Sequence, residues 1–419
     1  MKPQGASERR SAFSDAAVLR ACPICAGRRI DVLHHQDFAT PFELKAPPAY
    51  DVVACERCGF VYANQRVEQN ELDVDYAAHS KYAPPSASIA ADPPWDLERL
   101  AGVAAYLTQR IADKSMRVLD AGCANGSFLG FMKANGFSNI VGLDPSPAAV
   151  ANARARYGVD ALAGSFVSPP ASIGSFDVVT LSHTLEHLAD VGGAVTSLKA
   201  LLVPNGIAYI EVPDASRYAD YLVAPFHDFN TEHINHFSLR ILRLLMRRHG
   251  FVEIDANAGT VRNSPTDDYP VIFGLWRANG ASDASGGGFP SLEPDEDLVA
   301  SIRKYVELSS ILMHRMDEQL ALDLADSDEV IVWGAGQLTM KLLRNTVLRE
   351  KRVVAVVDAS VQRQGMHMDS TSILAPAALH DMPPFPIVIG SLLSETSIVT
   401  MIREQLHLKN PIVRLHRPA

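Results

Sequence analysis

Four of the five cysteines in this 419-residue sequence form two C-x-x-C pairs, with 29 residues between the pairs. The first pair is Cys22 and Cys25, and the second is Cys55 and Cys58. Four thiolates satisfy a tetrahedral zinc ion and leave no position open for water, so this spacing predicts a structural zinc site. A redox pair or four buried thiols are the alternatives. We expect no secretory signal and a reducing compartment, in which disulfides are disfavoured.

A second group of polar residues follows a short apolar run, in the stretch V-L-D-A-G-C-A-N-G. Asp120 precedes the glycines Gly122 and Gly126, and Asp144 comes 24 residues after Asp120, at the end of the next apolar run. Glycines there let a ligand approach the backbone at the carboxyl edge of a sheet. A carboxylate at that edge accepts hydrogen bonds from ribose hydroxyls. An acid before the glycines suits a cationic amino-acid group better than a pyrophosphate. The alternative is a related fold without a cofactor.

Histidines gather in two segments, S-H-T-L-E-H (residues 182–187) and F-H-D-F-N-T-E-H-I-N-H-F-S (residues 226–238). The first matches the H-x-x-E-H pattern of some zinc proteases. That enzyme class needs the motif on a long helix, whereas here it directly follows an apolar, strand-like run. A structural role for His183 and Glu186 in the loop is an alternative. A second metal site is another hypothesis, with His227, Asp228, His233 and His236 as its ligands.

The scaffold predicted for these groups is α/β. Apolar runs of four to six residues alternate with helical stretches between about residues 117 and 215, which predicts a parallel, doubly wound sheet. A second strand–glycine turn–helix pattern contains Gly334 and Gly336, and Asp358 ends the following strand. This second turn has three interpretations: a nicotinamide site, a turn that holds a diphosphate, or a structural remnant.

We therefore expect a small four-cysteine zinc module, a Rossmann-like domain and a second, smaller Rossmann-like α/β domain. The predicted boundaries are a flexible tail at 1–20, the zinc module at 21–75, the first α/β domain at 76–280, a linker at 281–297 and the second α/β domain at 298–419.

Charge and hydropathy exclude several function classes. The 38 basic and 48 acidic residues give a net charge of −10, which argues against a general nucleic-acid or anionic-membrane binder. No apolar run reaches the roughly 18 residues of a membrane span. We expect a cytoplasmic protein with a small-molecule substrate and with no nucleic-acid or membrane partner. The sequence leaves the oligomeric state open.

The stretch from about residue 117 to 215 resembles the class I S-adenosylmethionine-dependent methyltransferases, through its D-x-G-x-x-x-G turn and the acid that ends the next strand. The resemblance implies that this cofactor binds at the turn. It further implies roles for individual residues: Asp120, Gly122 and Gly126 line the methionine part, Asp144 holds the ribose, Ser165 and Phe166 lie near the adenine, and His183 lies at the edge of the sheet where the sulfonium sits. Cys123 is expected to be an apolar filler.

Over about residues 20–415 the chain resembles the C-methyltransferases of deoxysugar biosynthesis, which act on nucleotide-linked keto sugars. The motifs that carry the resemblance are the four cysteines, the D-x-G turn, T-L-E-H, E-H-I-N-H-F-S and the second α/β pattern. It implies that the C-terminal domain helps to enclose the nucleotide sugar. The implied active-site positions are His187, Glu232, His233 and a tyrosine, Tyr76 or, less well, Tyr82.

The sequence differs from that family at two places. Asn230 occupies the place of a tyrosine, and G-T-V-R-N-S (259–264) replaces an H-G-G-S-type turn. Methylation of a carbon beside a ketone needs a base and a donor to the enolate oxygen. We assign His233 as the base, Glu232 as its orienting or sharing partner, and His187 as the donor. The alternatives are an O- or N-methyltransferase of the same fold and a non-enzymatic adaptor.

Overall fold

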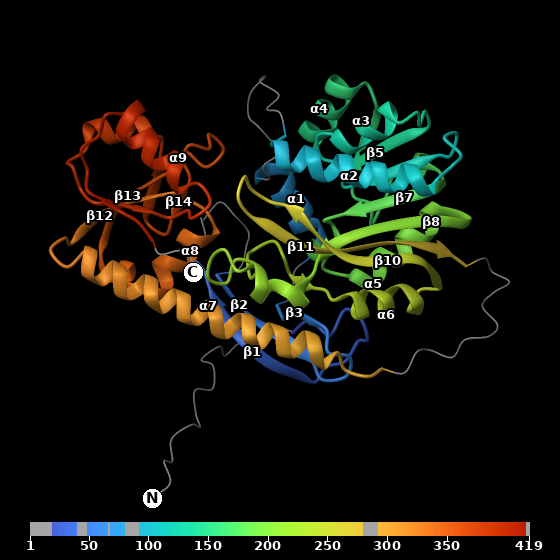
Figure 1. Cartoon of the computed structure of the whole chain (residues 1–419), viewed down its shortest axis with the longest axis horizontal. Helices are drawn as coiled ribbons and strands as arrows, with labels where there is room; N and C mark the ends of the chain where they lie inside the picture. The colour runs from blue at the N-terminus through green and yellow to red at the C-terminus, as the bar shows by residue number, and fades with distance from the viewer. Residues whose placement is uncertain (1–18, 40–47, 66–67, 80–91, 280–291, 416–419) are drawn as a thin grey trace, which may run out of the picture.

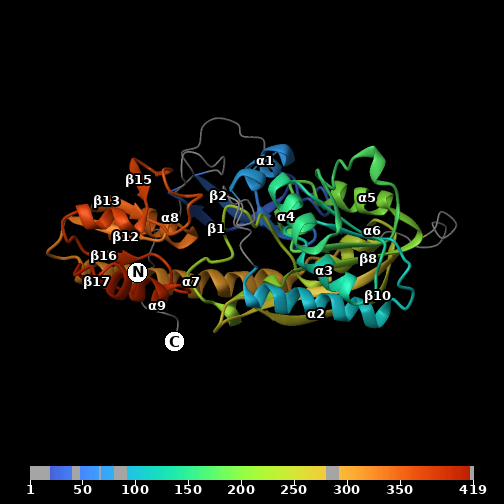
Figure 2. The ribbon, with the colours of Figure 1, turned by 90° about the horizontal axis from the view of Figure 1, so that it is seen from above.

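The computed structural model describes residues 19–39, 48–65, 68–79, 92–279 and 292–415, which form three sheets with flanking helices (Figures 1 and 2). Most of the predicted tail and linker, as well as Tyr82, lie outside these ranges.

The first sheet is antiparallel and carries the cysteines. Its order is β1 (Ile30–Asp37), β2 (Ala49–Cys55), β3 (Val61–Ala63) and β9 (Asn235–His236). Strand β9 comes from far along the chain, where it directly follows the E-H pair of the second histidine segment. This sheet with its four cysteines, the cysteine unit, therefore pairs with the segment that carries the E-H pair.

The second sheet has seven strands in the order β10-β11-β8-β7-β4-β5-β6. Their bounds are β4 (Val118–Ala121), β5 (Ile140–Asp144), β6 (Asp160–Ala163), β7 (Phe176–Ser182), β8 (Leu202–Pro213), β10 (Phe251–Arg262) and β11 (Asp268–Ala278). The sheet as a whole is mixed, because β10 and β11, which lie beyond the stretch predicted to be parallel, form a hairpin that adds antiparallel to β8. The other five strands are parallel.

Helices cover both faces of the seven-stranded sheet (Figure 1). One face packs against α2 (Pro94–Arg110), α3 (Ser127–Ala134) and α4 (Pro147–Tyr157), and the other packs against α5 (Val191–Leu201) and α6 (Leu239–Arg248). Helix α1 (Gln69–His79) precedes them. Helix α4 shows why the boundaries fall where they do: Ser146 caps its first turn, and Gly158 ends it with a φ of 58°.

The third sheet has six strands in the order β14-β15-β13-β12-β16-β17. Its strands are β12 (Glu329–Trp333), β13 (Arg352–Val357), β14 (His367–Met368), β15 (Thr371–Leu374), β16 (Ile387–Ile389) and β17 (Ile412–Val413). Its helices are α7 (Glu296–Asp323), α8 (Gln337–Asn345) and α9 (Glu395–Thr400). Helix α7 runs from beside the cysteine unit to the six-stranded unit (Figures 1 and 2). Strand β12 lies between parallel neighbours β13 and β16, so the connections diverge at its carboxyl end.

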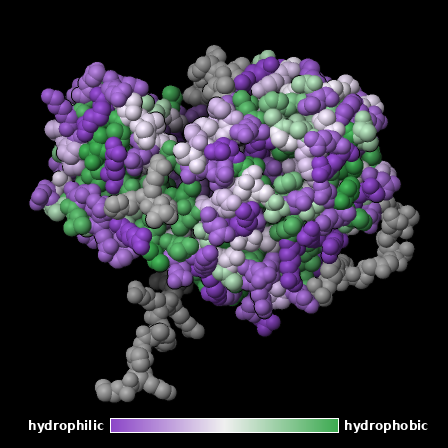
Figure 3. Space-filling view, viewed as in Figure 1, coloured by the Kyte–Doolittle hydropathy of each residue, from purple (hydrophilic) through white to green (hydrophobic). Residues whose placement is uncertain are grey.

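Short helical turns complete the described chain: η1 (Ala171–Ile173), η2 (Leu185–His187), η3 (Ala215–Tyr221), η5 (Val347–Glu350), η6 (Pro376–Asp381) and η7 (Met401–Gln405). The face in Figure 3 mixes hydrophilic and hydrophobic residues over both α/β units. Within the described ranges, no helix combines the length and apolar character that crossing a membrane requires.

Candidate active site

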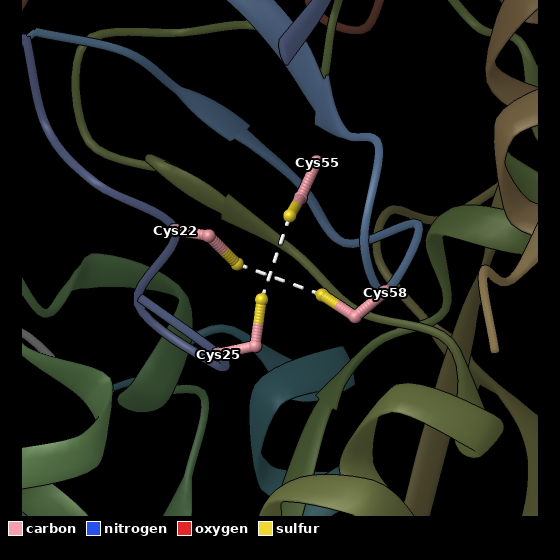
Figure 4. A group of neighbouring side chains, drawn as sticks. All are labelled: Cys22, Cys25, Cys55 and Cys58. Atoms are coloured by element: carbon pink, nitrogen blue, oxygen red, sulfur yellow. Dashed lines mark hydrogen bonds between the residues drawn. The ribbon is translucent and has the colours of Figure 1, made fainter. Parts of the chain in front are cut away.

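The four cysteines converge on one point, as Figure 4 shows. Their sulfurs all lie within 4.8 Å of one another, and all four residues are buried. The Cys22 and Cys58 sulfurs are 3.6 Å apart, and those of Cys25 and Cys55 are 3.5 Å apart. Two sulfurs bound to one zinc at about 2.3 Å lie roughly 3.8 Å apart. The four thiols therefore fit a tetrahedral ion.

Backbone geometry around the cysteines depends on glycine. A Cβ on Gly27 would lie 3.0 Å from the Cys55 sulfur, and Gly59 has a φ of 74° with the backbone of Asp295 directly against it. The Asp295 N–H donates to the Cys58 carbonyl at 3.1 Å, just before helix α7 begins. The cysteine unit therefore also anchors the start of α7.

A cavity of about 540 Å³ opens at the carboxyl edge of the seven-stranded sheet. It collects ten of the eleven residues predicted to bind the cofactor or to act in catalysis. These are Tyr76, Asp120, Gly122, Asp144, Ser165, Phe166, His183, His187, Glu232 and His233. Gly126, the eleventh residue, does not line the cavity. It caps α3 with a φ of 80°, and a Cβ there would lie 2.6 Å from the Cβ of Ala153. Its role is to let α3 and α4 approach each other.

Asp144 is prepared to accept hydrogen bonds. Its two oxygens accept the backbone N–H of Ala124 at 2.9 Å and that of Ser146 at 2.8 Å. Burial raises the pKa of Asp144 to about 6, and these hydrogen bonds limit the rise. Tyr76 also hydrogen-bonds Asp144. Tyr76 thus contacts the predicted ribose acceptor and lines the same cavity as His187 and His233.

Asp120 lies deeper, where burial raises its pKa to about 7 although the Thr180 hydroxyl donates to it at 2.6 Å. Gly122 has a φ of 89°, and a Cβ on it would lie 2.9 Å from the Thr184 hydroxyl oxygen. The glycine therefore keeps the turn open beside Asp120. Cys123 is buried next to Gly142, and burial raises the pKa of its thiol well above the usual value, as expected for a filler and not a nucleophile.

One charged cluster in the cavity was not expected from the sequence. Arg99 of α2 contacts Glu211 of β8 at 2.8 Å and the Ser182 hydroxyl at 2.7 Å. Burial alone would raise the pKa of Glu211, but Arg99, His183 and hydrogen bonds from Ser182 and Tyr209 lower it. In the sequence Arg99 is a single arginine on an amphipathic helix, so its position alone does not indicate this cluster.

The two histidine segments meet in the cavity. The rings of His187 and His233 have their centroids 4.9 Å apart and are nearly perpendicular. The Nδ1 of His187 donates to the Glu232 carbonyl at 3.1 Å. Burial and the neighbouring imidazoles hold the pKa of His233 well below its usual value, so this ring is neutral at neutral pH. A neutral imidazole can accept a proton or bind a cation.

Asn230 explains one departure from the deoxysugar enzymes. Its side-chain oxygen accepts the backbone N–H groups of Glu232 at 2.9 Å and His233 at 2.8 Å. This local turn, typical of asparagine, fixes the backbone of the E-H pair. Asn230 also lines the cavity.

The predicted ligand set of His227, Asp228, His233 and His236 does not come together. His236 lies in β9, packed against Tyr218 and Phe229, and neither of its ring nitrogens has a hydrogen-bond partner. Among the described residues, the second group with metal-ligand geometry is instead Glu186, His187 and His233. The H-x-x-E-H motif occupies a strand end and the short turn η2, not the long helix that a zinc protease needs.

A second cavity, of about 530 Å³, lies at the carboxyl ends of β12, β13 and β16. Asp358 there accepts the N–H of Ala335 at 2.7 Å and that of Ser360 at 2.8 Å, the same arrangement that Asp144 makes in the first unit. His227 and Arg363 line both cavities, so the two cavities adjoin. The second glycine turn therefore faces a ligand-sized space.

The comparisons with known proteins agree with this geometry. Residues 97–255 match the family described as a methyltransferase domain. The C-methyltransferase NovU of Streptomyces niveus is 27% identical over 230 residues, which are 50% of this chain and 48% of that protein. The ubiquinone biosynthesis O-methyltransferase of Marinobacter nauticus is 26% identical over 156 residues, 35% of this chain and 63% of that protein. The match therefore spans less than two-thirds of either relative.

The matches among solved structures include the magnesium protoporphyrin IX methyltransferase of Synechocystis PCC 6803 with bound S-adenosylmethionine. It is 14% identical, with a TM-score of 0.37, and the match covers 51% of this chain and 98% of that chain. The family match at 97–255 falls on the seven-stranded sheet and its helices. Residues 97–255 therefore resemble a methyltransferase domain and have an α/β Rossmann-like fold.

Proposed function

We propose that this protein transfers a methyl group from S-adenosylmethionine to a nucleotide-linked keto sugar, at the carbon beside the ketone. The observation that carries the proposal is the single cavity of about 540 Å³ that contains both the cofactor acids and the His187–His233 pair. Asp120 and Asp144 suit the methionine and ribose parts of the cofactor. When bound, S-adenosylmethionine supplies an electrophilic methyl group.

The side chains of the second histidine segment suit removal of the α-proton. The neutral imidazole of His233 lines the cavity as the proposed base, and Glu232 is its proposed partner, which orients the ring or shares the proton. His187 lies beside them and is the proposed donor to the enolate oxygen. Because its Nδ1–H already donates to the Glu232 carbonyl, this donation requires a second hydrogen, on Nε2. The contact of Tyr76 with Asp144 supports a role in covering the cofactor.

The adjoining second cavity supports a substrate with a long polar tail. Arg363 lines both cavities, and Arg262 lines the first. Two guanidinium groups that line the first cavity suit a diphosphate. We further propose that the four cysteines hold a structural Zn²⁺, as their converging sulfurs support.

An O-methyltransferase of the same fold is the second candidate, and the match to the ubiquinone biosynthesis enzyme favours it. The experiment that tests the proposal is a methyl-transfer assay with labelled S-adenosylmethionine and a panel of nucleotide-linked keto sugars. Product with a new carbon-bound methyl group supports the proposal. Methyl transfer only to a hydroxyl oxygen, or no transfer to any sugar of the panel, would contradict the proposal.

A further inference from the structure

Glu186 carries a buried carboxylate that the methyl-transfer mechanism does not use. Its side chain is 1% exposed, and neither of its oxygens has a hydrogen-bond partner. Burying an ionised carboxylate without hydrogen bonds is costly unless a cation compensates it. Its neighbours within ion-pair distance are His183 Nδ1 at 3.2 Å and His187 Nε2 at 3.8 Å from its Oε1. It also lines the main cavity.

The His187 ring is oriented as a ligand would be. Because Nδ1 lies 3.1 Å from the Glu232 carbonyl oxygen, which only accepts, Nδ1 carries the hydrogen. In the neutral ring Nε2 then carries a lone pair, and this lone pair lies on the side of the Glu186 carboxylate. Metal-bound histidines usually donate their other N–H to a carbonyl or carboxylate in this way. A cation between Nε2 and the carboxylate, which are 3.8 Å apart, would satisfy both lone pairs.

His233 completes the group. Its Nδ1 is buried without a partner, and its ring lies against that of His187. One ligand atom from each of Glu186, His187 and His233 falls within a 4.8 Å span. Donors bound at about 2.1 Å to one ion lie roughly 3.0–3.4 Å apart, so binding draws these atoms closer by a rotamer adjustment.

We propose that Glu186, His187 and His233 bind a divalent first-row transition-metal ion at the substrate end of the cavity. Two imidazoles and one carboxylate suit Mn²⁺, Fe²⁺, Co²⁺ or Zn²⁺, whereas Mg²⁺ and Ca²⁺ prefer oxygen ligands. Three protein ligands leave positions open toward the cavity. His183 orients the carboxylate from outside the ligand set.

The consequence for catalysis rests on the proposed function. An ion there would bind the ketone oxygen of the acceptor and stabilise the enolate in place of a hydrogen bond from His187. His233 would then be a ligand, and the α-proton would go to the carboxylate of Glu232, which lines the same cavity. Binding of the ion itself requires no substrate and is tested separately.

The test is a titration of the full chain with Mn²⁺ after dialysis against a mild chelator. Binding is measured as the loss of the electron paramagnetic resonance signal of free Mn²⁺. A parallel titration with Co²⁺ covers ions that prefer nitrogen ligands. We expect one saturable site per chain. Glu186→Gln and His187→Asn should weaken it by more than the roughly 10–100-fold that loss of an outer-shell partner costs. Binding of S-adenosylmethionine reports that both variants are folded.

Two matched controls separate this site from other metal binding. Glu318→Gln removes the carboxylate of an exposed His314–Glu318 pair, 3.3 Å apart on α7, and should leave the titration unchanged. His314→Asn removes the imidazole of the same pair and should also leave the Mn²⁺ stoichiometry unchanged. No saturable Mn²⁺ or Co²⁺ site in the wild type, or equal binding by Glu186→Gln, would overturn the proposal.

Methyl transfer distinguishes this inference from the proposed function. Turnover that falls after dialysis and returns with Mn²⁺ or Co²⁺ supports the ion. Full turnover by ion-free protein that retains its cysteine-bound metal contradicts the catalytic role of the ion and leaves the proposed function standing. Ion binding without methyl transfer to any keto sugar contradicts the proposed function and leaves the metal site standing.

Discussion

Asp144 and Asp358 are equivalent carboxylates in the two α/β units, since each accepts two backbone N–H groups at the end of a second parallel strand. Their equivalence provides a matched pair of substitutions. The family match covers the unit that contains Asp144 and does not extend to the unit that contains Asp358. Cofactor binding should therefore depend on Asp144 and not on Asp358.

We predict that Asp144→Ala weakens S-adenosylmethionine binding on the order of a hundredfold or more. The variant loses two hydrogen bonds to a charged acceptor, worth roughly 1.5–3 kcal/mol each. Isothermal titration calorimetry measures the change, and Asp358→Ala is the control that should retain wild-type affinity. Equal affinity in wild type and Asp144→Ala would mean that the cofactor binds elsewhere.

Cofactor affinity should also depend on pH through Asp120. Burial raises its pKa to about 7, above the value of 3.8 for a free aspartate, so the empty protein holds this proton in weakly acidic solution. Protonation of Asp120 favours the folded, empty protein at low pH, and this contribution to the free energy of unfolding is lost as pH rises through about 7. A cationic ligand favours the ionised form. Affinity should therefore increase from pH 5.5 to about 7 and then level off.

Asp120→Asn tests this assignment. The variant should bind more weakly and lose the dependence near pH 7, while Asp144, with a pKa raised to about 6, retains its own dependence at lower pH. A wild-type affinity that stays constant across this range would contradict the placement of the cationic group beside Asp120.

His233→Asn should cut turnover by roughly 10²–10⁴-fold with cofactor affinity nearly unchanged, because the cofactor contacts lie on other strand ends. Steady-state kinetics and calorimetry on the same preparation give the two values. Arg243→Gln, which removes one partner of a part-exposed pair with Glu253, is the control for general effects of substitution. Near-full turnover of His233→Asn would exclude this residue both as base and as essential ligand.

At the scale of elements, strand β9 links the cysteine unit to the active site. It pairs with β3, the Ala63 N–H donates to the Ile234 carbonyl at 3.0 Å, and the Tyr50 hydroxyl donates to the Asn230 carbonyl at 2.8 Å. These contacts hold the segment on both sides of Glu232 and His233. Loss of a metal bound by the cysteines should therefore lower the rate of methyl transfer.

Cys55→Ser should lose one zinc per chain, lower the melting temperature and reduce turnover more than it reduces cofactor affinity, since a structural zinc contributes folding free energy directly. Elemental analysis, thermal denaturation and kinetics measure the three effects. Cys123→Ala, outside the cluster, should retain the zinc. A wild-type protein purified without chelator and free of zinc would contradict the site.

Elements buried on both faces were predictable from sequence, and elements that depend on distant partners were not. The runs V-L-D-A and E-V-I-V-W are buried almost throughout, and such runs indicate parallel strands. Strand β9 has two residues and exists because β3 lies beside it. The antiparallel hairpin β10–β11 lies at the edge of its sheet, and the residues of β10 are mostly not buried, so β10 has no continuous apolar run that would indicate a strand.

The same contrast applies to the site. Asp120 and Asp144 could be predicted because each stands at the end of a parallel strand, where ligands bind. Arg99 and Glu211 belong to elements far apart in sequence and meet only in the folded chain. Glu186 looked like a loop residue, and its burial beside His187 and His233 depends on the second histidine segment folding across it.

At the scale of the whole molecule, the six-stranded unit contacts the second histidine segment (residues 226–238) directly. The fully buried Lys341 of α8 donates to the Phe226 carbonyl at 2.5 Å, and Gln337 donates to the Thr231 hydroxyl at 2.7 Å. Burial lowers the pKa of Lys341 to about 7. The second α/β unit thus supports the loop that carries Glu232 and His233, and its cavity adjoins the reaction site.

The central claim is carbon methylation by S-adenosylmethionine in the first cavity. The most direct measurement is the reaction of a nucleotide-linked keto sugar in deuterated water with an isotope-labelled methyl donor, followed by nuclear magnetic resonance of the product. The account predicts a labelled methyl group bonded to the carbon beside the ketone, with deuterium exchange at that carbon in wild type and its loss in His233→Asn. A labelled methyl group on oxygen or nitrogen, without exchange at carbon, would contradict it.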